Sequence, residues 1–125
     1  MPNPHNDFQP TGLNTDIPIF QKTYDLYKMF YEICVHFPKK DKYTLGQKIE
    51  NGILKLLESI ILASQLAKTE KAPILKQASG KLDIIKVLIR LSNDLKIIDS
   101  KKYLNLQSSL QEIGKMLGGW IKASS

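Results

Sequence analysis

Inward-facing residues recur at helical spacing along four segments of the chain. In the first segment, from about Ile17 to His36, steps of four and three residues alternate. The positions are Ile19, Thr23, Leu26, Phe30, Ile33 and Phe37. Such steps are typical of the contact face of a helix in an antiparallel bundle. Pro38 then ends the helix, because proline disfavours helical geometry in the residue before it.

A second stripe on this helix consists of Tyr24, Tyr27 and Tyr31. Tyrosines at this spacing are typical of packing within a bundle, with the hydroxyl group in water. They could also form a platform on which nucleobases stack. We favour packing within the bundle.

The second helical segment runs from Thr44 to about Lys68. Thr44 and Gln47 form a capping-box pattern at its start. Its inward positions are Leu45, Ile49, Ile53, Leu56, Ile60, Ala63 and Ala67. Gly52 lies in the middle of this segment, at a cost of about 1 kcal/mol relative to alanine. We therefore expect another helix to approach closely at Gly52.

The third segment, from about Pro73 to Ile97, is apolar on two neighbouring faces. One face consists of Leu82, Ile85, Leu88, Ile89 and Leu95, and the other of Ile84, Val87, Leu91 and Ile98. A helix of this kind has to be covered on more than one side. Its polar seam carries Asp83, Lys86, Arg90 and Asp94, so Lys86 and Arg90 project side by side. The seam is either a solvated stripe or a contact for a polyanion.

The fourth segment begins after Asp99 and Ser100, which offer a helix cap. Its inward positions are Tyr103, Leu106, Leu110, Ile113, Leu117 and Trp120. Together the segments predict an all-α protein, an antiparallel up-down four-helix bundle over residues 17–125. Residues 1–16 are rich in Pro, Asn and Gly and have no hydrophobic period, so we expect a flexible N-terminal arm there.

The charge of the chain favours an acidic partner. It contains 18 Lys and Arg against 12 Asp and Glu, a net charge of +6. Such an excess is moderate evidence for a partner such as nucleic acid. Because Arg90 is the one arginine, the excess consists mainly of lysine point charges, and we expect little sequence-specific reading of bases.

Motifs of common active sites are absent from the sequence. The histidines are His5 and His36, and there is no CxxC pair, GxxxxGK[ST] loop or GxGxxG turn. The glutamates are scattered singly along polar strips. We therefore predict that the protein is not an enzyme and that it holds no metal or cofactor.

The sequence also indicates where the protein works. Cys34 is the one cysteine, so no internal disulfide can form, which fits a reducing cytoplasm. The first twenty residues resemble neither a signal peptide nor a membrane anchor. No run of about 18 apolar residues occurs. We predict a soluble cytoplasmic protein without a membrane partner.

Two segments carry a resemblance to a known family. Residues 37–51 (FPKKDKYTLGQKIEN) and 113–120 (IGKMLGGW), together with the stretch 82–95, resemble the accessory variability determinant (Avd) family of diversity-generating retroelements. The resemblance extends over about Phe20 to Lys122. It implies a four-helix bundle that assembles as a homopentameric barrel with a basic surface.

The resemblance also implies a function. Avd proteins are accessory subunits that associate with the reverse transcriptase of the element and with its template RNA, and they support mutagenic cDNA synthesis. Basic residues on the third helix of the family bear on nucleic-acid binding, and they correspond here to Lys86 and Arg90. Further candidates for binding RNA, or DNA, are Lys48 and Lys55 on the second helix and Lys39, Lys40 and Lys42 in the basic loop before it.

The sequence also allows a second interpretation of the protein's function. The segment 37–51 is also similar to the four-helix-bundle proteins encoded in ribosomal RNA intervening sequences. By that interpretation the protein is a bundle scaffold without a polymerase partner, and its charge only aids solubility. The glycine-rich segment 113–120 favours the Avd family.

Overall fold

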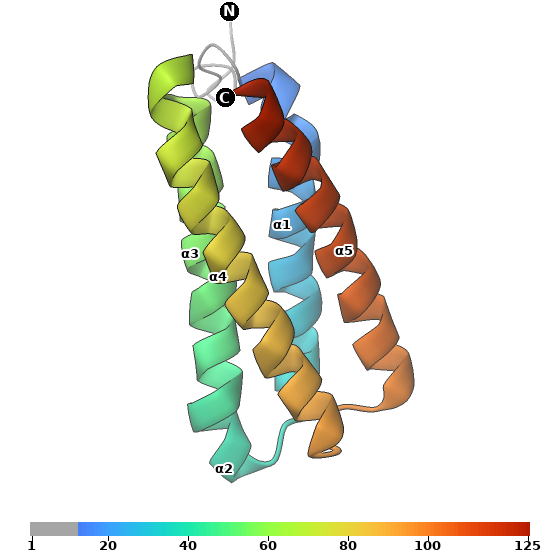
Figure 1. Cartoon of the computed structure of the whole chain (residues 1–125). Coiled ribbons are helices and arrows are strands. Elements are labelled where there is room, and N and C mark those ends of the chain that lie inside the picture. Colours follow the sequence, from blue (N-terminus) through green and yellow to red (C-terminus); the bar gives the residue numbers. More distant parts are fainter. Residues whose placement is uncertain (1–12) are drawn as a thin grey trace, which may run out of the picture.

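The computed structural model describes residues 13–125, and this part of the chain is helical without any strand (Figure 1). The four long helices are α1 (Leu13–Cys34), α3 (Gln47–Ser64), α4 (Lys68–Asp94) and α5 (Ser100–Ala123). A short helix α2 (Lys39–Asp41) and a π-helical turn η2 (Lys42–Gly46) connect α1 to α3. The predicted all-α fold with four helices is confirmed. None of the described helices combines the length and the apolar character needed to cross a bilayer.

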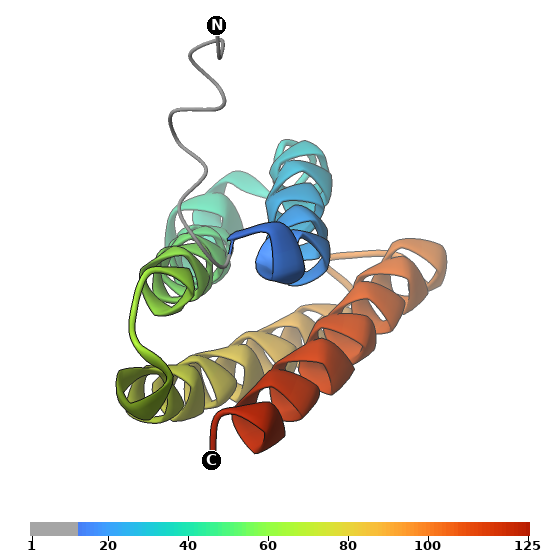
Figure 2. The same cartoon turned by 90° about the horizontal axis from the view of Figure 1, so that it is seen from above.

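The helices form two layers, α1 beside α3 and α4 beside α5 (Figure 2). Helix α3 packs against both α1 and α4, and α5 likewise packs against both. Helix α1 starts, and α5 ends, at the same end of the bundle (Figure 1). Neighbouring helices therefore run antiparallel, in the up-down order that the sequence predicts.

The predicted inward positions fill the core. In α1 and the turn after it, all six are buried, and the hydroxyl group of Thr23 donates a hydrogen bond of 2.8 Å to the carbonyl oxygen of Ile19. In α5, Leu106, Leu110, Ile113 and Leu117 are buried, while Tyr103 and Trp120 at its two ends are half-buried. The helical period alone identifies this core, because its contacts lie on one face of each helix.

The helix boundaries differ from the prediction in several places. Helix α1 begins at Leu13, so residues 13–16 are helical rather than part of an arm; the other residues of the expected arm, 1–12, lie outside the described residues. Helix α3 ends at Ser64 instead of Lys68, and the exposed Ala67 is not part of its core face. The ammonium group of Lys71 donates a 2.8 Å hydrogen bond to the carbonyl oxygen of Ala63 and so satisfies this helix end.

Thr44 does not cap α3, contrary to the prediction. Its hydroxyl group donates to the carbonyl oxygen of Lys40 at 2.9 Å, because helical geometry already begins with α2. Asp99, in contrast, caps α5 as predicted. Its Oδ1 atom accepts a hydrogen bond of 2.8 Å from the backbone nitrogen of Lys102.

The turn between α4 and α5 is stabilised by its backbone. Helix α4 ends at Asp94, three residues before the expected Ile97, because Lys96 adopts a left-handed conformation with φ of 61°. The backbone nitrogens of Lys96 and Ile97 then donate to the carbonyl oxygens of Asn93 and Ser92, each at 2.9 Å. This pair of bonds is the Schellman pattern that terminates many helices.

Candidate nucleic-acid interface

Lys86 and Arg90 lie together in a groove between α4 and α5, hereafter the α4–α5 groove, of about 240 Å³. Lys86 is half-buried and Arg90 is exposed. The opposite wall carries Tyr103, Gln107 and Gln111 of α5. This groove presents two cations beside neutral hydrogen-bonding groups, and none of the described residues that line it is a carboxylate.

Gly114 of α5 makes room for Lys86. A Cβ atom at Gly114 would lie 3.4 Å from the ammonium nitrogen of Lys86, so the lysine side chain extends over this glycine. The one salt bridge among the described residues joins Lys22 to Glu112 at 2.9 Å. Within the described part of the chain, neither Lys86 nor Arg90 has a carboxylate within 4 Å, so we expect both charges to be available to a ligand.

Lys48 and Lys55 lie in a second groove, between α3 and α4, of about 270 Å³. Lys81 of α4 joins them in this α3–α4 groove, and its ammonium group donates a 2.8 Å hydrogen bond to the hydroxyl oxygen of Ser59. Its apolar floor is formed by Ile85 and Leu88, and the exposed Ile84 lies at its edge. Sequence reasoning missed Lys81, although its place one turn before Ile84 and Ile85 was the signal that it shares their side of the helix.

Gly52 allows α3 and α4 to approach closely beneath the α3–α4 groove. A Cβ atom at Gly52 would lie only 3.1 Å from Cγ1 of Ile85, which confirms the predicted close approach. The absence of a side chain at this position also keeps the groove open along its length, since Gly52 itself lines it.

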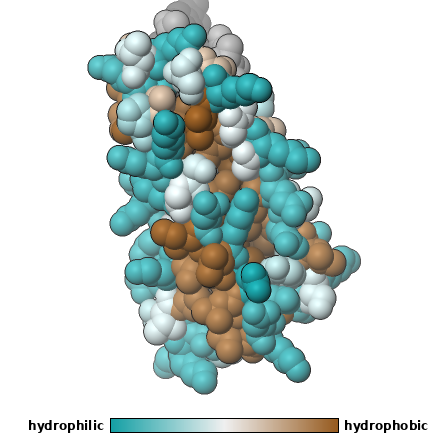
Figure 3. Space-filling view, in the orientation of Figure 1, coloured by the Kyte–Doolittle hydropathy of each residue, from teal (hydrophilic) through white to brown (hydrophobic). Residues whose placement is uncertain are grey.

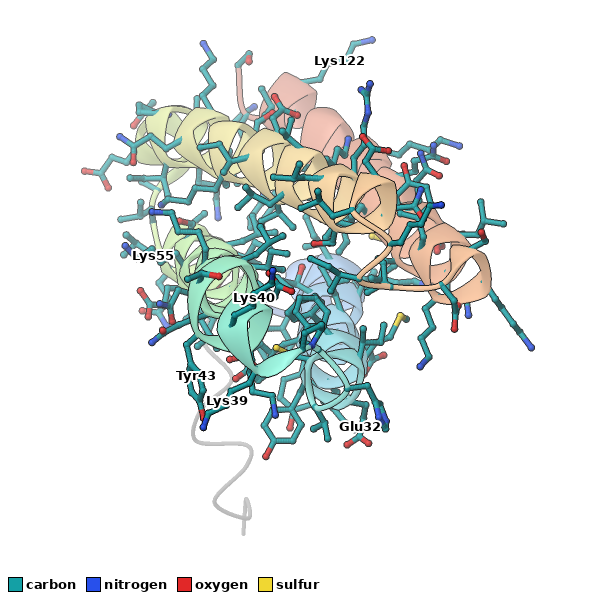
Figure 4. The ribbon with its side chains drawn as sticks, turned by 90° about the horizontal axis from the view of Figure 1, so that it is seen from below. Glu32, Lys39, Lys40, Tyr43, Lys55 and Lys122 are labelled. Carbon is teal, nitrogen blue, oxygen red and sulfur yellow. The ribbon has the colours of Figure 1, made fainter. Side chains whose placement is uncertain are left out.

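The lysines of the predicted basic loop separate in the structure. Lys39 and Lys40 are exposed on α2, and in Figure 4 the side chain of Lys39, unlike that of Lys40, lies toward the strongly exposed Tyr43. Lys42 instead lines a hollow with Cys34 and Glu50 on the α1–α3 side. The seven candidate residues thus occupy the two grooves that flank α4 and the α2 end of the bundle, not one continuous site.

An exposed apolar strip runs along α4 between the two grooves. It consists of Ile84, Val87, Leu91 and Leu95, with exposed fractions of 59%, 63%, 42% and 58%. Figure 3 shows apolar side chains gathered in the lower half of the view. The prediction of a second apolar face on this helix is confirmed, but two residues change places: Leu95, expected in the core, is exposed, and Ile98, expected on the second face, is buried in the turn after α4.

The tyrosines of α1 also differ from the prediction. Tyr24 and Tyr31 are 45% and 54% exposed, so their rings do not pack inside the bundle. Their rings pack against aromatic neighbours on the same helix. The ring centroids of Tyr24 and Phe20 are 5.8 Å apart, and those of Tyr31 and Tyr27 are 6.3 Å apart. Tyr24, Tyr31 and the exposed Val35 form an outward surface, hereafter the tyrosine face.

Two groups near the α2 end have shifted pKa values. Burial raises the pKa of the Cys34 thiol, and Glu50 adds to the effect while Lys42 opposes it. The pKa of Tyr27 is also raised, first by burial and then by Glu50, Tyr31 and Cys34. Both groups therefore stay neutral at pH 7. No three His, Cys, Asp or Glu side chains of the described chain cluster in a way that could hold a metal ion.

These features define a class of protein, a four-helix bundle with two cation-lined grooves and an exposed apolar strip between them. A family model described as bAvd-like matches residues 18–124. The chain belongs to the bAvd-like family, and the resemblance to Avd proteins is confirmed. No curated protein matches the chain.

Proposed function

We propose that this protein is a non-enzymatic accessory subunit of a diversity-generating retroelement. In this role it binds the reverse transcriptase of the element and its RNA in the cytoplasm, with the cDNA as a further ligand, and supports mutagenic reverse transcription. Membership of the bAvd-like family supports the accessory role. The observation that carries the nucleic-acid part is the α4–α5 groove, where the half-buried Lys86 and the exposed Arg90 have no carboxylate partner among the described residues.

The chemistry of this groove fits phosphate rather than base edges. An ammonium and a guanidinium group one helical turn apart can each contact a phosphate of the backbone, and such contacts carry no sequence information. Binding displaces condensed counterions, so affinity falls as the salt concentration rises. The exposed Lys39 and Lys40 at the α2 end are separate candidates for further phosphate contacts.

Self-assembly is the second part of the proposal. The apolar strip of α4 is wider than a monomeric bundle needs, and apolar patches of this kind mark interaction sites. We propose that it is covered in a closed homo-oligomer, a pentamer as in the Avd family. Five copies would carry a formal charge of +30, five times the +6 of one chain, and would make many phosphate contacts at once.

The variant Lys86→Ala/Arg90→Ala tests the nucleic-acid site. We expect weaker binding of single-stranded RNA and DNA of equal length, with the slope of log affinity against log salt smaller by about 1.4 if both phosphate contacts are lost. Helicity and oligomer size should not change, because alanine is the best helix former and the change removes a repulsion between like charges. Co-purification with the reverse transcriptase measures the other partner separately.

The matched control is Lys101→Ala/Lys102→Ala, which removes the same charge from the first turn of α5. It should affect binding less than the change in the α4–α5 groove. Equal losses in both variants would mean that only net charge matters and would contradict a site at Lys86 and Arg90. A protein that binds neither nucleic acid nor the polymerase would instead fit the bundle-scaffold alternative.

A further inference from the structure

The α3–α4 groove and the tyrosine face of α1 complement each other in charge and in apolar character. The groove carries Lys48, Lys55 and Lys81 around an apolar floor, and its lining among residues 13–125 contains no carboxylate. The tyrosine face lies beside two exposed carboxylates, Asp25 and Glu32. Each of the two surfaces thus combines an apolar area with a row of charge, and the rows have opposite sign.

The spacing of the two surfaces also matches. Lys48 and Lys55 are seven residues apart on α3, and so are Asp25 and Glu32 on α1. Seven residues span two helical turns, roughly 10 Å, and return to the same side of a helix. Carboxylates on a helix laid along α3 would therefore meet both lysines in one register.

The apolar residues repeat at the same interval. Tyr24 and Tyr31 are seven residues apart, as are Ile84 and Leu91 on the strip beside the groove. With the carboxylates opposite the lysines, the tyrosine rings would lie over the apolar floor and strip. Tyrosine is enriched in the buried centres of protein interfaces, because it supplies a large rigid area and a hydroxyl group that can stay solvated.

The two surfaces cannot satisfy each other within one chain. Glu32 projects from α1 and Lys55 from α3 on different sides of the bundle (Figure 4). The one salt bridge in the described part of the chain, Lys22 to Glu112, involves neither surface. Asp25 accepts a hydrogen bond from Gln21 on the same helix. The ammonium nitrogen of Lys28 lies 5.7 Å from the centroid of the Tyr24 ring. With Lys28 included, Asp25 and Glu32 leave a net charge of −1 on this side of α1, against +3 in the groove.

We propose that α1 of one copy docks, through its tyrosine face, into the α3–α4 groove and onto the adjoining apolar strip of a second copy. This inference rests on the self-assembly in the proposed function and names the surfaces that meet. The contact joins two different surfaces, so each copy can both offer α1 and receive it. Repetition of such a contact gives a ring if the rotation closes. The proposed docking assigns Lys48 and Lys55 to the interface between copies, and the α4–α5 groove stays open to nucleic acid.

Charge reversal tests this docking. The variant Lys48→Glu/Lys55→Glu places like charges opposite Asp25 and Glu32, and Asp25→Lys/Glu32→Lys does the same from the other side. Each should weaken assembly by about tenfold or more, because like-charge contacts across an interface are strongly unfavourable. The chain with all four changes restores opposite charges and keeps the net charge of +6, so it should assemble again. All four side chains are exposed, so the fold should tolerate every variant.

Native mass spectrometry and light scattering at micromolar concentration give the readout, with circular dichroism to check folding. The matched control Lys68→Glu/Lys76→Glu makes the same change in net charge at exposed positions of α4 outside the groove and should assemble normally. Loss of assembly in each double variant with recovery in the fourfold variant would support the docking. An oligomer that neither charge reversal weakens would overturn the docking but leave the proposed self-assembly intact. A natural protein that is monomeric would overturn both the docking and the self-assembly. If Lys48→Glu/Lys55→Glu reduces RNA binding but not assembly, the docking is overturned and the α3–α4 groove binds nucleic acid instead.

Discussion

Gly46 has no room for a side chain. A Cβ atom there would lie 2.7 Å from the Sγ atom of Cys34 and 3.2 Å from the ring of Phe37. Both neighbours are buried, Cys34 as the last residue of α1 and Phe37 in the turn after it, so neither can move far. Gly46 therefore fixes how closely the η2 turn packs on that end.

At this residue we expect Gly46→Ala to lower the free energy of unfolding by about 1 to 3 kcal/mol, the usual cost of overpacking a core. Urea unfolding followed by circular dichroism measures the change. Adding Cys34→Ala removes the clashing sulfur atom and should recover part of the loss.

Gly80→Ala serves as the control, because a Cβ atom at this position in the interior of α4 meets nothing within 4 Å. It should raise the free energy of unfolding by up to about 1 kcal/mol through helix propensity. If both substitutions stabilised the protein equally, the close contact at Gly46 would be refuted.

The start of α5 depends on one side chain. Asp99 accepts a hydrogen bond from the backbone of Lys102, and its negative charge lies at the positive end of the helix dipole. Replacement by alanine leaves this backbone donor without its partner. We expect Asp99→Ala to lower the free energy of unfolding by about 0.5 to 2 kcal/mol, measured by urea unfolding.

Thr44→Ala is the comparison for Asp99→Ala. Thr44 is exposed and its hydroxyl group bonds within the turn instead of capping α3, so its loss should change stability by less than about 0.5 kcal/mol. A larger loss for Thr44→Ala than for Asp99→Ala would show that the capping box acts after all.

The side chains of helix α4 face three different environments. Leu82, Ile85 and Ile89 are buried in the bundle, the apolar strip faces outward, and basic residues line a groove on either side of the strip. A helix turns by about 100° per residue, so one segment can supply all of these directions. This explains why its sequence is too apolar for a surface helix and too polar for a core helix.

For the whole molecule we expect assembly and nucleic-acid binding to be coupled. The variant Leu91→Gln/Leu95→Gln makes part of the apolar strip polar without changing the charge, and both positions are exposed and line neither groove, so the monomer should stay folded. We expect light scattering to show a smaller species that binds RNA more weakly and with a shallower salt dependence, because fewer phosphates are contacted together.

Leu62→Gln/Leu104→Gln is the matched control. These leucines are also exposed, at 48% and 60%, but they belong to α3 and α5 and not to the strip on α4. This variant should keep the size and the RNA affinity of the natural protein. If it dissociated while the strip variant did not, the interface would have to be sought elsewhere.

The sequence predicted the core better than the site. Ile53 and Leu110 are buried as predicted because the inward face of a helix follows from its period, whatever its neighbours are. Lys86 and Arg90 were paired correctly for the same reason, since residues four apart share a side of one helix. Lys81 was missed because it joins Lys48 and Lys55 only when α4 lies against α3.

Local sequence patterns failed where tertiary contacts competed with them. Thr44 and Gln47 match a capping box, yet the chain is already helical from α2 onward. Tyr24 and Tyr31 have the spacing of a packing stripe, yet they turn outward because the two neighbouring helices cover a different side of α1.

By itself, the sequence determined the helical class, the four long segments, the core positions and an excess of positive charge, because each depends on composition or on a period within one segment. Tertiary structure alone decided which charges share a groove, how closely Lys86 approaches Gly114, and which apolar residues remain uncovered. A groove takes its walls from helices far apart in the chain, so its composition depends on how those helices are rotated and spaced against one another. No single segment encodes that arrangement.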